Sequence, residues 1–511
     1  MARNGSTGDP VRAESGLEHV DVLIVGAGLT GIGAAWRLQE ALPHMSYAIL
    51  EAREVSGGTW DLFRYPGIRS DSDMQTFGYG FRPWREPQAI ADGASILDYI
   101  RGTAAEAGID RHIRYRHRIV KAEWSSADAR WTVTVRQGGD PGSITTMTCG
   151  FLHMCTGYYR YDHGHTPSFE GQEHFTGQIV HPQQWPADLD YRNKRVIVIG
   201  SGATAITLVP TLARTAAHVT MLQRSPTYIV SLPAKDPLAS GLQRLIGKRA
   251  AYPVVRWKNI AVNAASYQLG QRAPGVSKAI IRGQLKRLLP KGYDVDTHFK
   301  PRYKPWDQRL CVVPDADLFK AISDGRASMA TDHIDAFTKT GVRLASGQEI
   351  AADIVVTATG LDLLGMGGAQ LLVDGTEVTL SQTTAYRGMM LSGVPNLAFT
   401  MGYTNASWTL KADLVSGFVC RVLAHMEQHG YRQVLPTEPA GTEHRPLLDF
   451  SAGYVQRSID RFPRSGSKEP WRPGNNYLRD LITFRRARLD DEALRYSNPI
   501  AVPQQPARTG S

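Results

Sequence analysis

The chain has 511 residues, of which 42% are hydrophobic and 21% are charged, so it has room for two or three globular domains. It contains no run of about 20 apolar residues, so we expect no membrane-spanning helix. The formal net charge of +10 comes with no nucleic-acid recognition motif, and nucleic acid is therefore not an expected partner.

The N-terminal 18 residues are polar and lack the apolar core of a signal peptide. We therefore expect a disordered tail and a cytoplasmic protein. Cysteines follow neither a C-x-x-C nor a zinc-ligand spacing, which favours buried or incidental thiols in a reducing compartment. No metal site and no redox dithiol are predicted from Cys149, Cys155, Cys311 and Cys420.

The first motif is a glycine turn after a short apolar strand. Residues 21–24 (DVLI) predict the strand, residues 26–31 read G-A-G-L-T-G, and a helix is expected from Ile32. This order of strand, G-x-G-x-x-G and helix predicts a dinucleotide site, with the pyrophosphate at the helix N-terminus. The first glycine makes the tight turn, the second admits the pyrophosphate, and the third lets the helix pack on the strand. The expected contacts come from Gly26, Gly28, Thr30 and Gly31.

A carboxylate follows the next strand. Residues 47–50 predict that strand, and Glu51 comes directly after it, 25 residues beyond Gly26. A carboxylate at this place accepts hydrogen bonds from a ribose hydroxyl and would repel a 2′-phosphate. The first site therefore fits FAD or NAD and not NADP. Residues 57–73 hold too many glycines, prolines and aromatic residues for a regular helix, so we predict a long ordered loop there.

The linker at residues 175–186 reads FTGQIVHPQQWP and precedes a second glycine turn. Two nucleotide sites joined by a patterned linker indicate that electrons pass between two cofactors. A histidine in it has an ordinary pKa near neutrality and would suit acid–base work, but the linker position favours a conformational role between domains. The spacing F-x-G-x-x-x-H-x-x-x-W-P is formed by Phe175, Gly177, His181, Trp185 and Pro186.

The second dinucleotide unit begins with a strand at residues 195–199, followed by G-S-G-A-T-A. The next strand, at residues 218–223, ends in Arg224 and Ser225 where the first unit carries its acid. An arginine can donate two hydrogen bonds to a 2′-phosphate, so this unit fits NADPH. Its expected cofactor contacts are Gly200, Ser201, Gly202, Ala203, Thr204, Arg224 and Ser225.

Positive charge is concentrated at residues 244–309, a range that largely overlaps the stretch from 230 to 303 predicted to be helical. The segment has 15 Lys/Arg and three Asp, a balance of 15 − 3 = +12. It could steer a polyanionic cofactor, touch an anionic membrane surface, or simply form a solvated helical face. Peripheral membrane contact through 244–309 therefore stays open.

Together these motifs resemble type I Baeyer–Villiger monooxygenases, a class of flavoprotein monooxygenases. The resemblance rests on the linker motif and on the runs GGTWDLFRYPGIRSDSDM, VIGSGATA, MLQRSPTYIVS, KPWDQR and GYTNASWTLKADLVS. These runs look most similar to the actinobacterial ethionamide-activating subgroup. The Thr-Gly steps at 155–159 and 357–360 resemble the paired crossings between the FAD and NADPH domains of such enzymes.

The resemblance implies roles for further residues. Arg309 would lie over the flavin as an electrostatic stabiliser, and Asp71, near the flavin–nicotinamide junction, would orient it. Gln308 stands where the family often has lysine, so the 2′-phosphate would depend on Arg224 or Lys304. Residues 402–414 would close over the flavin. The FAD contacts implied by likeness are Gly58, Thr59, Trp60, Asp61, Leu62, Asp71 and Ile119.

The implied activity is an FAD-, NADPH- and O₂-dependent conversion of ketones to esters or lactones through a C4a-peroxyflavin, with S-oxidation of thioethers and thioamides. The expected substrate is a small hydrophobic ketone or sulfur compound, and the sequence does not indicate an oligomeric state. Three alternatives stay open. They are an N- or S-hydroxylating flavin monooxygenase, a disulfide reductase, which lacks its cysteine pair here, and a non-catalytic nucleotide- or membrane-binding protein.

The predicted fold is α/β, with two Rossmann-like dinucleotide-binding domains and a helical insertion in the NADPH domain. The predicted division is a tail at 1–18, the FAD domain at 19–160 and 366–498, the NADPH domain at 161–229 and 304–365, the insertion at 230–303, and a tail at 499–511.

Overall fold

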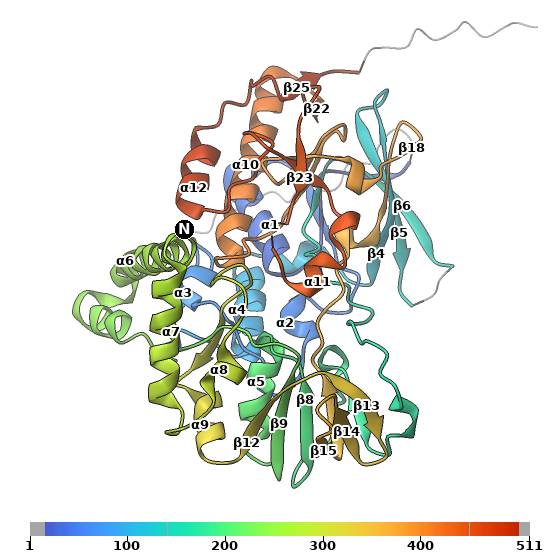
Figure 1. The fold of residues 1–511 in the computed structure, drawn as a ribbon. Coiled ribbons are helices and arrows are strands. Elements are labelled where there is room, and N and C mark those ends of the chain that lie inside the picture. The colour runs from blue at the N-terminus through green and yellow to red at the C-terminus, as the bar shows by residue number, and fades with distance from the viewer. Residues whose placement is uncertain (1–15, 140–141, 449, 500–511) are drawn as a thin grey trace, which may run out of the picture.

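The computed structural model describes residues 16–139, 142–448 and 450–499. It contains two units built on parallel strands, with a layer of helices along one edge (Figure 1). The predicted tails at 1–18 and 499–511 lie almost wholly outside the described residues. The first tail was predicted slightly too long, because β1 already begins at Glu18.

The first unit is built on a nine-stranded sheet. Its strands are β1 (Glu18–Val25), β2 (Tyr47–Leu50), β3 (Ile113–Arg114), β4 (His117–Ser125), β5 (Arg130–Gln137), β6 (Ile144–Met154), β17 (Gln370–Val373), β18 (Thr376–Glu377) and β21 (Leu397–Phe399). Their order is β18-β17-β4-β5-β6-β1-β2-β3, and β21 also pairs with β6. β1 runs parallel to β2 and β6, whereas β4, β5 and β6 form an antiparallel meander.

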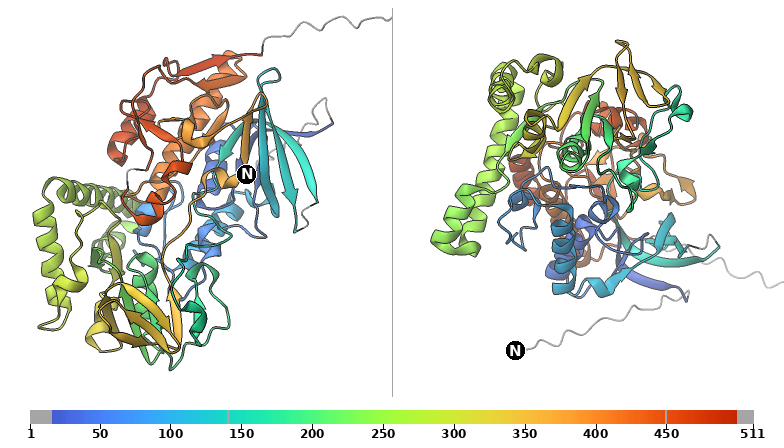
Figure 2. Two further views of the ribbon diagram at one scale, coloured as in Figure 1. Left: turned by 45° about the vertical axis from the view of Figure 1, so that its right-hand side comes forward. Right: turned by 90° about the horizontal axis from the view of Figure 1, so that it is seen from below.

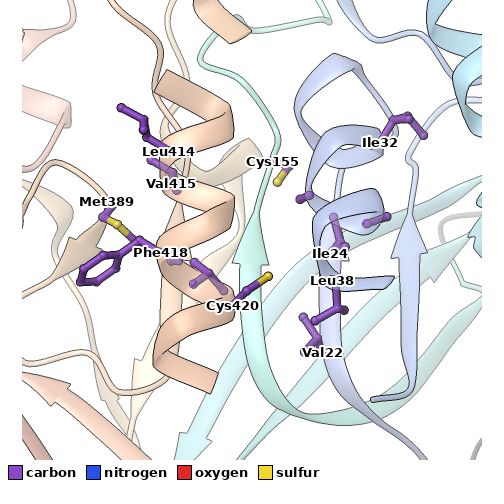
Figure 3. Close-up of a cluster of buried hydrophobic side chains, with 14 of the residues drawn as sticks. Val22, Ile24, Ile32, Leu38, Cys155, Met389, Leu414, Val415, Phe418 and Cys420 are labelled. Atoms are coloured by element: carbon purple, nitrogen blue, oxygen red, sulfur yellow. The ribbon is translucent and has the colours of Figure 1, made fainter. Parts of the chain in front are cut away.

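Helices α1 (Leu29–Ala41), α4 (Gly93–Glu106) and α10 (Trp408–His429) contribute to one hydrophobic core with this sheet. Figure 3 shows Cys420 of α10 pointing towards Val22 and Ile24 of β1 and Leu38 of α1, whereas Phe418 lies on the other side of α10 beside Met389. The sequence positions of α1 and α10 are far apart, so their packing joins the two ends of the chain. Smaller elements complete this unit: α2 (Thr59–Leu62), α3 (Met74–Phe77), β19 (Ala385–Tyr386), β20 (Met390–Leu391), β22 (Gln433–Pro436), β23 (His444–Pro446), α11 (Gly453–Gln456), β24 (Arg464–Gly466), α12 (Tyr477–Arg486) and β25 (Leu494–Ser497).

The second unit is a five-stranded parallel sheet of β7 (Gln178–Val180), β8 (Arg195–Ile199), β9 (His218–Gln223), β12 (Ala327–Thr331) and β16 (Ile354–Thr357). The strand order is β12-β9-β8-β16-β7. Helices α5 (Ala203–Leu212) and α9 (Asp317–Ser323) share its core, and the antiparallel strands β13 (Ile334–Thr338), β14 (Gly341–Leu344) and β15 (Glu349–Ala351) lie beside it. The first glycine turn thus follows β1, and the second follows β8.

A helical layer interrupts the second unit. It consists of α6 (Pro237–Arg272), α7 (Pro274–Leu288) and α8 (Val295–Phe299), and lies at one edge of the molecule (Figures 1 and 2). Gly247 has a φ of +81°, which divides α6 into two helical pieces. β10 (Ile229–Leu232) and β11 (Cys311–Pro314) pair in parallel where the layer leaves and rejoins the unit.

Three predicted boundaries were wrong. The first helix begins at Leu29 and not at Ile32, because the glycine turn itself opens the helix. The loop at 57–73 contains the short helix α2. The insertion does not become helical at residue 230, since residues 229–232 form a strand whose partner β11 lies about 80 positions later, beyond any local pattern.

Candidate active site

A cavity of about 360 Å³ lies mainly in the first unit, and Arg309 reaches into it from the segment that follows the helical layer. Its walls come from the first glycine turn, the loop after α2, the segment 155–162, and the side chains of Arg309 and Trp408. Of the residues predicted to bind FAD or act on the substrate, the cavity is lined by Gly26, Gly28, Thr30, Glu51, Gly58, Thr59, Trp60, Asp71, Ile119 and Arg309.

The first glycine turn fits a pyrophosphate. Gly26 has a φ of +106°, and a Cβ there would lie 2.6 Å from the carbonyl oxygen of Cys155. A Cβ at Gly31 would lie 1.9 Å from the carbonyl oxygen of Gly26, so only glycine allows this close packing. α1 begins directly after Gly28, and no side chain caps it. Its first N–H groups are therefore directed to the cavity, where a phosphate would accept them.

Glu51 occupies the place expected of a ribose-binding acid. Its carboxylate is 6% exposed and accepts hydrogen bonds from the backbone N–H of Ala27 and of Arg53, each at 2.9 Å. Burial raises the pKa of Glu51, and the two N–H donors oppose that rise. Each oxygen keeps a further lone pair, so the carboxylate can accept a hydrogen bond from a ribose hydroxyl in the cavity.

Asp61 and Leu62 do not line the cavity. The carboxylate of Asp61 is buried and pairs with Arg53 at 2.5 Å and with Arg101 of α4 at 2.9 Å. Although burial opposes the charge, these arginines lower the pKa of Asp61. Asp61 therefore connects α2 to α4 by an ion pair, and it supports the lining residues of α2 without lining the cavity itself.

Arg309 and Asp71 form a two-point ion pair inside the cavity. Arg309 Nε lies 2.7 Å from one carboxylate oxygen, and its Nη2 lies 2.8 Å from the other and 3.0 Å from Ser72 Oγ. Burial disfavours the guanidinium charge, yet the neighbouring Asp71 carboxylate holds the pKa of Arg309 above its ordinary value. About a third of each side chain stays exposed to the cavity. The pair thus presents a fixed, permanent cation.

Aromatic side chains surround this cation. Tyr158 stacks on Trp408 with ring centroids 5.1 Å apart, and Tyr159 lies next to Tyr158 at 4.6 Å. Trp408 donates its indole N–H to Thr30 Oγ1 at 2.9 Å, which places residues 402–414 against the first glycine turn. Burial raises the pKa of Tyr158 well above its usual range, so its hydroxyl stays neutral. Tyr158 and Trp408 thus form an aromatic part of the cavity wall, next to its polar and charged residues.

The second glycine turn lies at the end of β8. Gly200 has a φ of +141°, and a Cβ there would lie 2.3 Å from the carbonyl oxygen of Ala358. A Cβ at Gly202 would meet nothing within 4 Å, so the start of α5 faces open space. Ala203 is the first residue of α5, and Ser201 precedes its N-cap. Thr204, one residue further on, lies within hydrogen-bonding reach of the Tyr65 hydroxyl.

Two arginines approach each other beside this turn. Arg224 is exposed directly after β9, next to Ser225, and forms no ion pair within the described ranges. Burial and the positive charge of Arg224 lower the pKa of Arg457, which follows α11. The nearby Asp362 carboxylate opposes this lowering but forms no ion pair with Arg457 among the described residues. Two neighbouring guanidinium groups suit a dianionic 2′-phosphate.

The comparisons with known proteins agree with two nucleotide sites. The model of the NAD(P)-binding Rossmann-like domain matches residues 24–88, and that of the flavin-binding monooxygenase-like family matches residues 79–248. The chain is 56% identical over 490 residues to the FAD-containing monooxygenase EthA of Mycobacterium tuberculosis (strain ATCC 25618 / H37Rv), covering 95% of this chain and 100% of that protein. The chain belongs to the FAD-containing monooxygenases.

Other members of this family are also similar. The putative FAD-containing monooxygenase MymA of Mycobacterium tuberculosis is 48% identical, covering 94% of this chain and 98% of that protein. Among solved structures, a steroid monooxygenase bound to NADP has a TM-score of 0.74 at 21% identity, covering 94% of this chain and 99% of that one. An open cyclohexanone monooxygenase has a TM-score of 0.73 at 17% identity, covering 94% of this chain and 100% of that one. These structures establish the shared fold with two dinucleotide domains.

In this FAD-containing monooxygenase, the linker motif lies outside the cavity. His181 Nε2 contacts the carbonyl oxygen of Gly360 at 3.3 Å, and its Nδ1 accepts the backbone N–H of Gln183 at 3.2 Å. Burial lowers the pKa of His181, so the ring is neutral near pH 7, with the proton on Nε2. His181 therefore connects the linker to the second crossing between the units.

The other residues of the motif stabilise the second unit. Phe175 packs edge-on against Phe337 with ring centroids 5.9 Å apart. A Cβ at Gly177 would lie 2.4 Å from the carbonyl oxygen of Asp353. Trp185 packs on Tyr191, and the exposed Pro186 follows it.

Sequence reasoning missed the tyrosines of the cavity and Arg457. The run CTGYY drew attention to its Thr-Gly step, although Tyr158 and Tyr159 carry the contacts with Trp408 and the surroundings of Arg309. Nothing local distinguishes Arg457 from a surface arginine. Gln308, at the position often occupied by lysine, directs its amide to the carbonyl oxygen of Ser451 at 3.5 Å.

Proposed function

We propose that the enzyme is a Baeyer–Villiger monooxygenase that uses FAD, NADPH and O₂ to convert hydrophobic ketones into esters or lactones. We also propose S-oxidation of thioethers and thioamides as a second activity of the same site. Bound FAD supplies the oxygen-activating chemistry. The observation that carries the proposal is the Arg309–Asp71 pair, which sets an oriented cation in the cavity that the first dinucleotide turn lines.

Arg309 stabilises negative charge that develops on the carbonyl oxygen of the ketone. The two contacts with Asp71 and the bond to Ser72 fix the guanidinium plane before the substrate arrives. Because arginine stays protonated throughout, it acts as a fixed charge and not as a proton donor. The aromatic wall of Tyr158 and Trp408 excludes water and offers an apolar surface to the substrate.

Arg224 and Arg457 support the assignment of NADPH to the second site. Neither forms an ion pair in the described part of the chain, and the positive charge of Arg224 acts on Arg457, so a bound dianion would relieve their mutual repulsion. NADH lacks this phosphate, so the arginines would favour NADPH.

Product analysis tests the reaction type. The holoenzyme is incubated with a phenyl or aliphatic ketone, NADPH and O₂, and the products are separated by gas chromatography with mass detection. An ester in proportion to the NADPH consumed supports the proposal. Hydrogen peroxide without any ester, together with sulfoxides or N-oxides from sulfur and amine substrates, would instead identify an N- or S-hydroxylating monooxygenase. The match of residues 79–248 to the broad flavin-binding monooxygenase-like family is the observation that keeps this second candidate in the test.

No helix among the described residues is long and apolar enough to cross a lipid bilayer. We propose that the enzyme acts in the cytoplasm. All four cysteines are buried and unpaired, which fits a reducing compartment.

A further inference from the structure

Exposed apolar side chains gather on the helical layer. Of the 14 large hydrophobic side chains exposed among the described residues, nine lie on α6 and α7 and two on α12. Single exposed hydrophobic residues are ordinary, but a concentration on neighbouring helices marks an interaction surface. We define the apolar face as Leu238, Leu245, Ile246, Val254, Trp257, Val262, Leu269, Val276 and Ile280.

The apolar face is the outer side of helices that are firmly held on their inner side. On α6, Tyr252 donates to the carbonyl oxygen of Tyr79 at 3.0 Å, and Arg256 donates to that of Gln75 at 2.6 Å. Ile260 is 4% exposed, whereas Val254 and Val262 are 55% and 61% exposed. At 100° per residue, these two valines point away from the anchored side. Packing within this chain therefore does not account for them.

Basic side chains lie on the same helices as the apolar face. Some positive charges of the segment 244–309 are already used, since Lys258 pairs with Asp236, Arg282 with Asp296, and Arg309 with Asp71. Others on or beside α6 and α7 form no ion pair within the described residues: Arg244, Arg249, Arg272, Lys278, Lys286, Arg287 and Lys291. α12 adds exposed Leu478 and Ile482 with Arg485 and Arg486 beside α6, where Tyr477 contacts Trp257.

We propose that the apolar face of α6 and α7 docks the enzyme on an anionic lipid bilayer. Amphipathic helices that carry Trp, Leu and Val on one side and Lys and Arg around them lie in the interfacial plane of such membranes. The long cationic side chains extend to the headgroups while the apolar side chains enter the acyl boundary. A second copy of the chain is a poorer occupant, because it would bring two segments of +12 against each other.

Docking leaves the active site intact and close to the surface. Arg256 connects α6 to the carbonyl oxygens of Gln75 and Gly78, and Phe77 between them lines the cavity. The docked helix α6 is thus joined directly to α3, which forms part of the cavity wall. The bilayer would therefore lie on the α3 side of the molecule. Lipid binding itself does not depend on the reaction that the cavity performs.

The experiment is flotation of the FAD-loaded full chain with phosphatidylcholine vesicles, with and without phosphatidylglycerol, at low and high salt. We expect binding to anionic vesicles at low salt and its loss at high salt. The charge variant Lys286→Glu, Arg287→Glu, Lys291→Glu should bind about a hundredfold more weakly. The apolar variant Val254→Ser, Val262→Ser, Leu269→Ser should bind at least about tenfold more weakly.

Matched variants control for charge and hydrophobicity in general. Lys194→Glu, Lys320→Glu and Lys339→Glu remove the same charge from exposed positions elsewhere, and Val55→Ser and Ile144→Ser remove exposed apolar groups elsewhere. Both sets should bind like the original protein.

Trp257 provides a direct probe of lipid contact. The quenching of tryptophan fluorescence by brominated lipids should be weaker in Trp257→Phe than in the original protein. Flavin absorbance and the thermal midpoint show that each variant is folded.

Several results would overturn the proposal. They are no flotation with anionic vesicles at low salt, equal loss of binding in the matched controls, or full binding by the apolar variant. A dimer in light scattering that the apolar variant dissociates, with no vesicle binding, would assign the face to a second copy instead.

Discussion

Arg309 and Asp71 lie 238 positions apart in the chain and meet in the cavity. Removing the guanidinium should leave cofactor binding intact, because the first glycine turn and Glu51 do not contact it. It should remove the charge that stabilises the substrate oxygen, an effect worth about a hundredfold or more in rate. We therefore expect Arg309→Ala to be reduced by NADPH in stopped-flow absorbance yet to form almost no ester.

Arg309→Lys is the informative companion variant. Lysine keeps the charge but cannot reproduce the two-point contact with Asp71, so an intermediate ester yield is expected. Normal ester synthesis by Arg309→Ala would assign the chemistry to other groups of the cavity.

Arg224 gives a prediction for the other cofactor. A charge-assisted hydrogen bond contributes about 1.5 to 3 kcal/mol, so Arg224→Ala should raise KM for NADPH by roughly ten- to a hundredfold. KM for NADH should hardly change, because NADH carries no 2′-phosphate. Steady-state kinetics with both nucleotides measures the ratio, and Lys194→Ala, an exposed cation near the same sheet, serves as the control. An equal rise for both nucleotides would argue against a phosphate contact.

At the scale of elements, β6 lies at the centre of the large sheet and pairs with β1, β5 and β21. His153 is buried on β6, and its Nε2 lies 3.1 Å from Thr400 Oγ1. Burial lowers the pKa of His153 to about 4, from 6.5 when exposed. Between pH 6.5 and about 4, His153 is therefore protonated in the unfolded chain and neutral in the folded sheet.

This difference predicts a pH dependence of stability. The contribution of neutral His153 is complete above pH 6.5 and is lost as the pH falls towards 4, which lowers the free energy of unfolding by about 2 kcal/mol between pH 7.5 and 5. His153→Asn should show a loss smaller by that amount in urea unfolding. The exposed His174→Asn should retain the original slope. Identical slopes for all three proteins would refute the assignment.

At the scale of the whole molecule, the two units must act in sequence on one electron pair, and His181 joins the linker to the crossing at residues 357–360. His181→Ala removes both of its contacts, so we expect loosened coupling between the units. The expected result is a severalfold rise in hydrogen peroxide formed per NADPH, with less ester. His181→Gln, which retains a donor, should be affected less. Unchanged coupling in His181→Ala would leave the residue without this role.

Local patterns determined much of the framework. The predicted strands at 47–50, 195–199 and 218–223 have these bounds in the structure, because short apolar runs bounded by turn residues specify buried strands. Both glycine turns precede helices as expected, since the requirement for positive φ and for close backbone approach is local. The sequence also predicted Glu51 beside the first turn and Arg224 beside the second, because the fold fixes the spacing between each glycine turn and the end of the next strand.

Tertiary structure decided what depends on distant contacts. The family resemblance implied that Asp61 contacts FAD, but in the fold its carboxylate pairs with Arg53 and Arg101. Arg457 reaches Arg224 only because two units pack together, and no spacing in the sequence encodes that approach. Composition likewise gave the +12 of residues 244–309 but not which face of α6 stays exposed. A helix buries the side that meets its neighbours, and only the folded chain determines which neighbours those are.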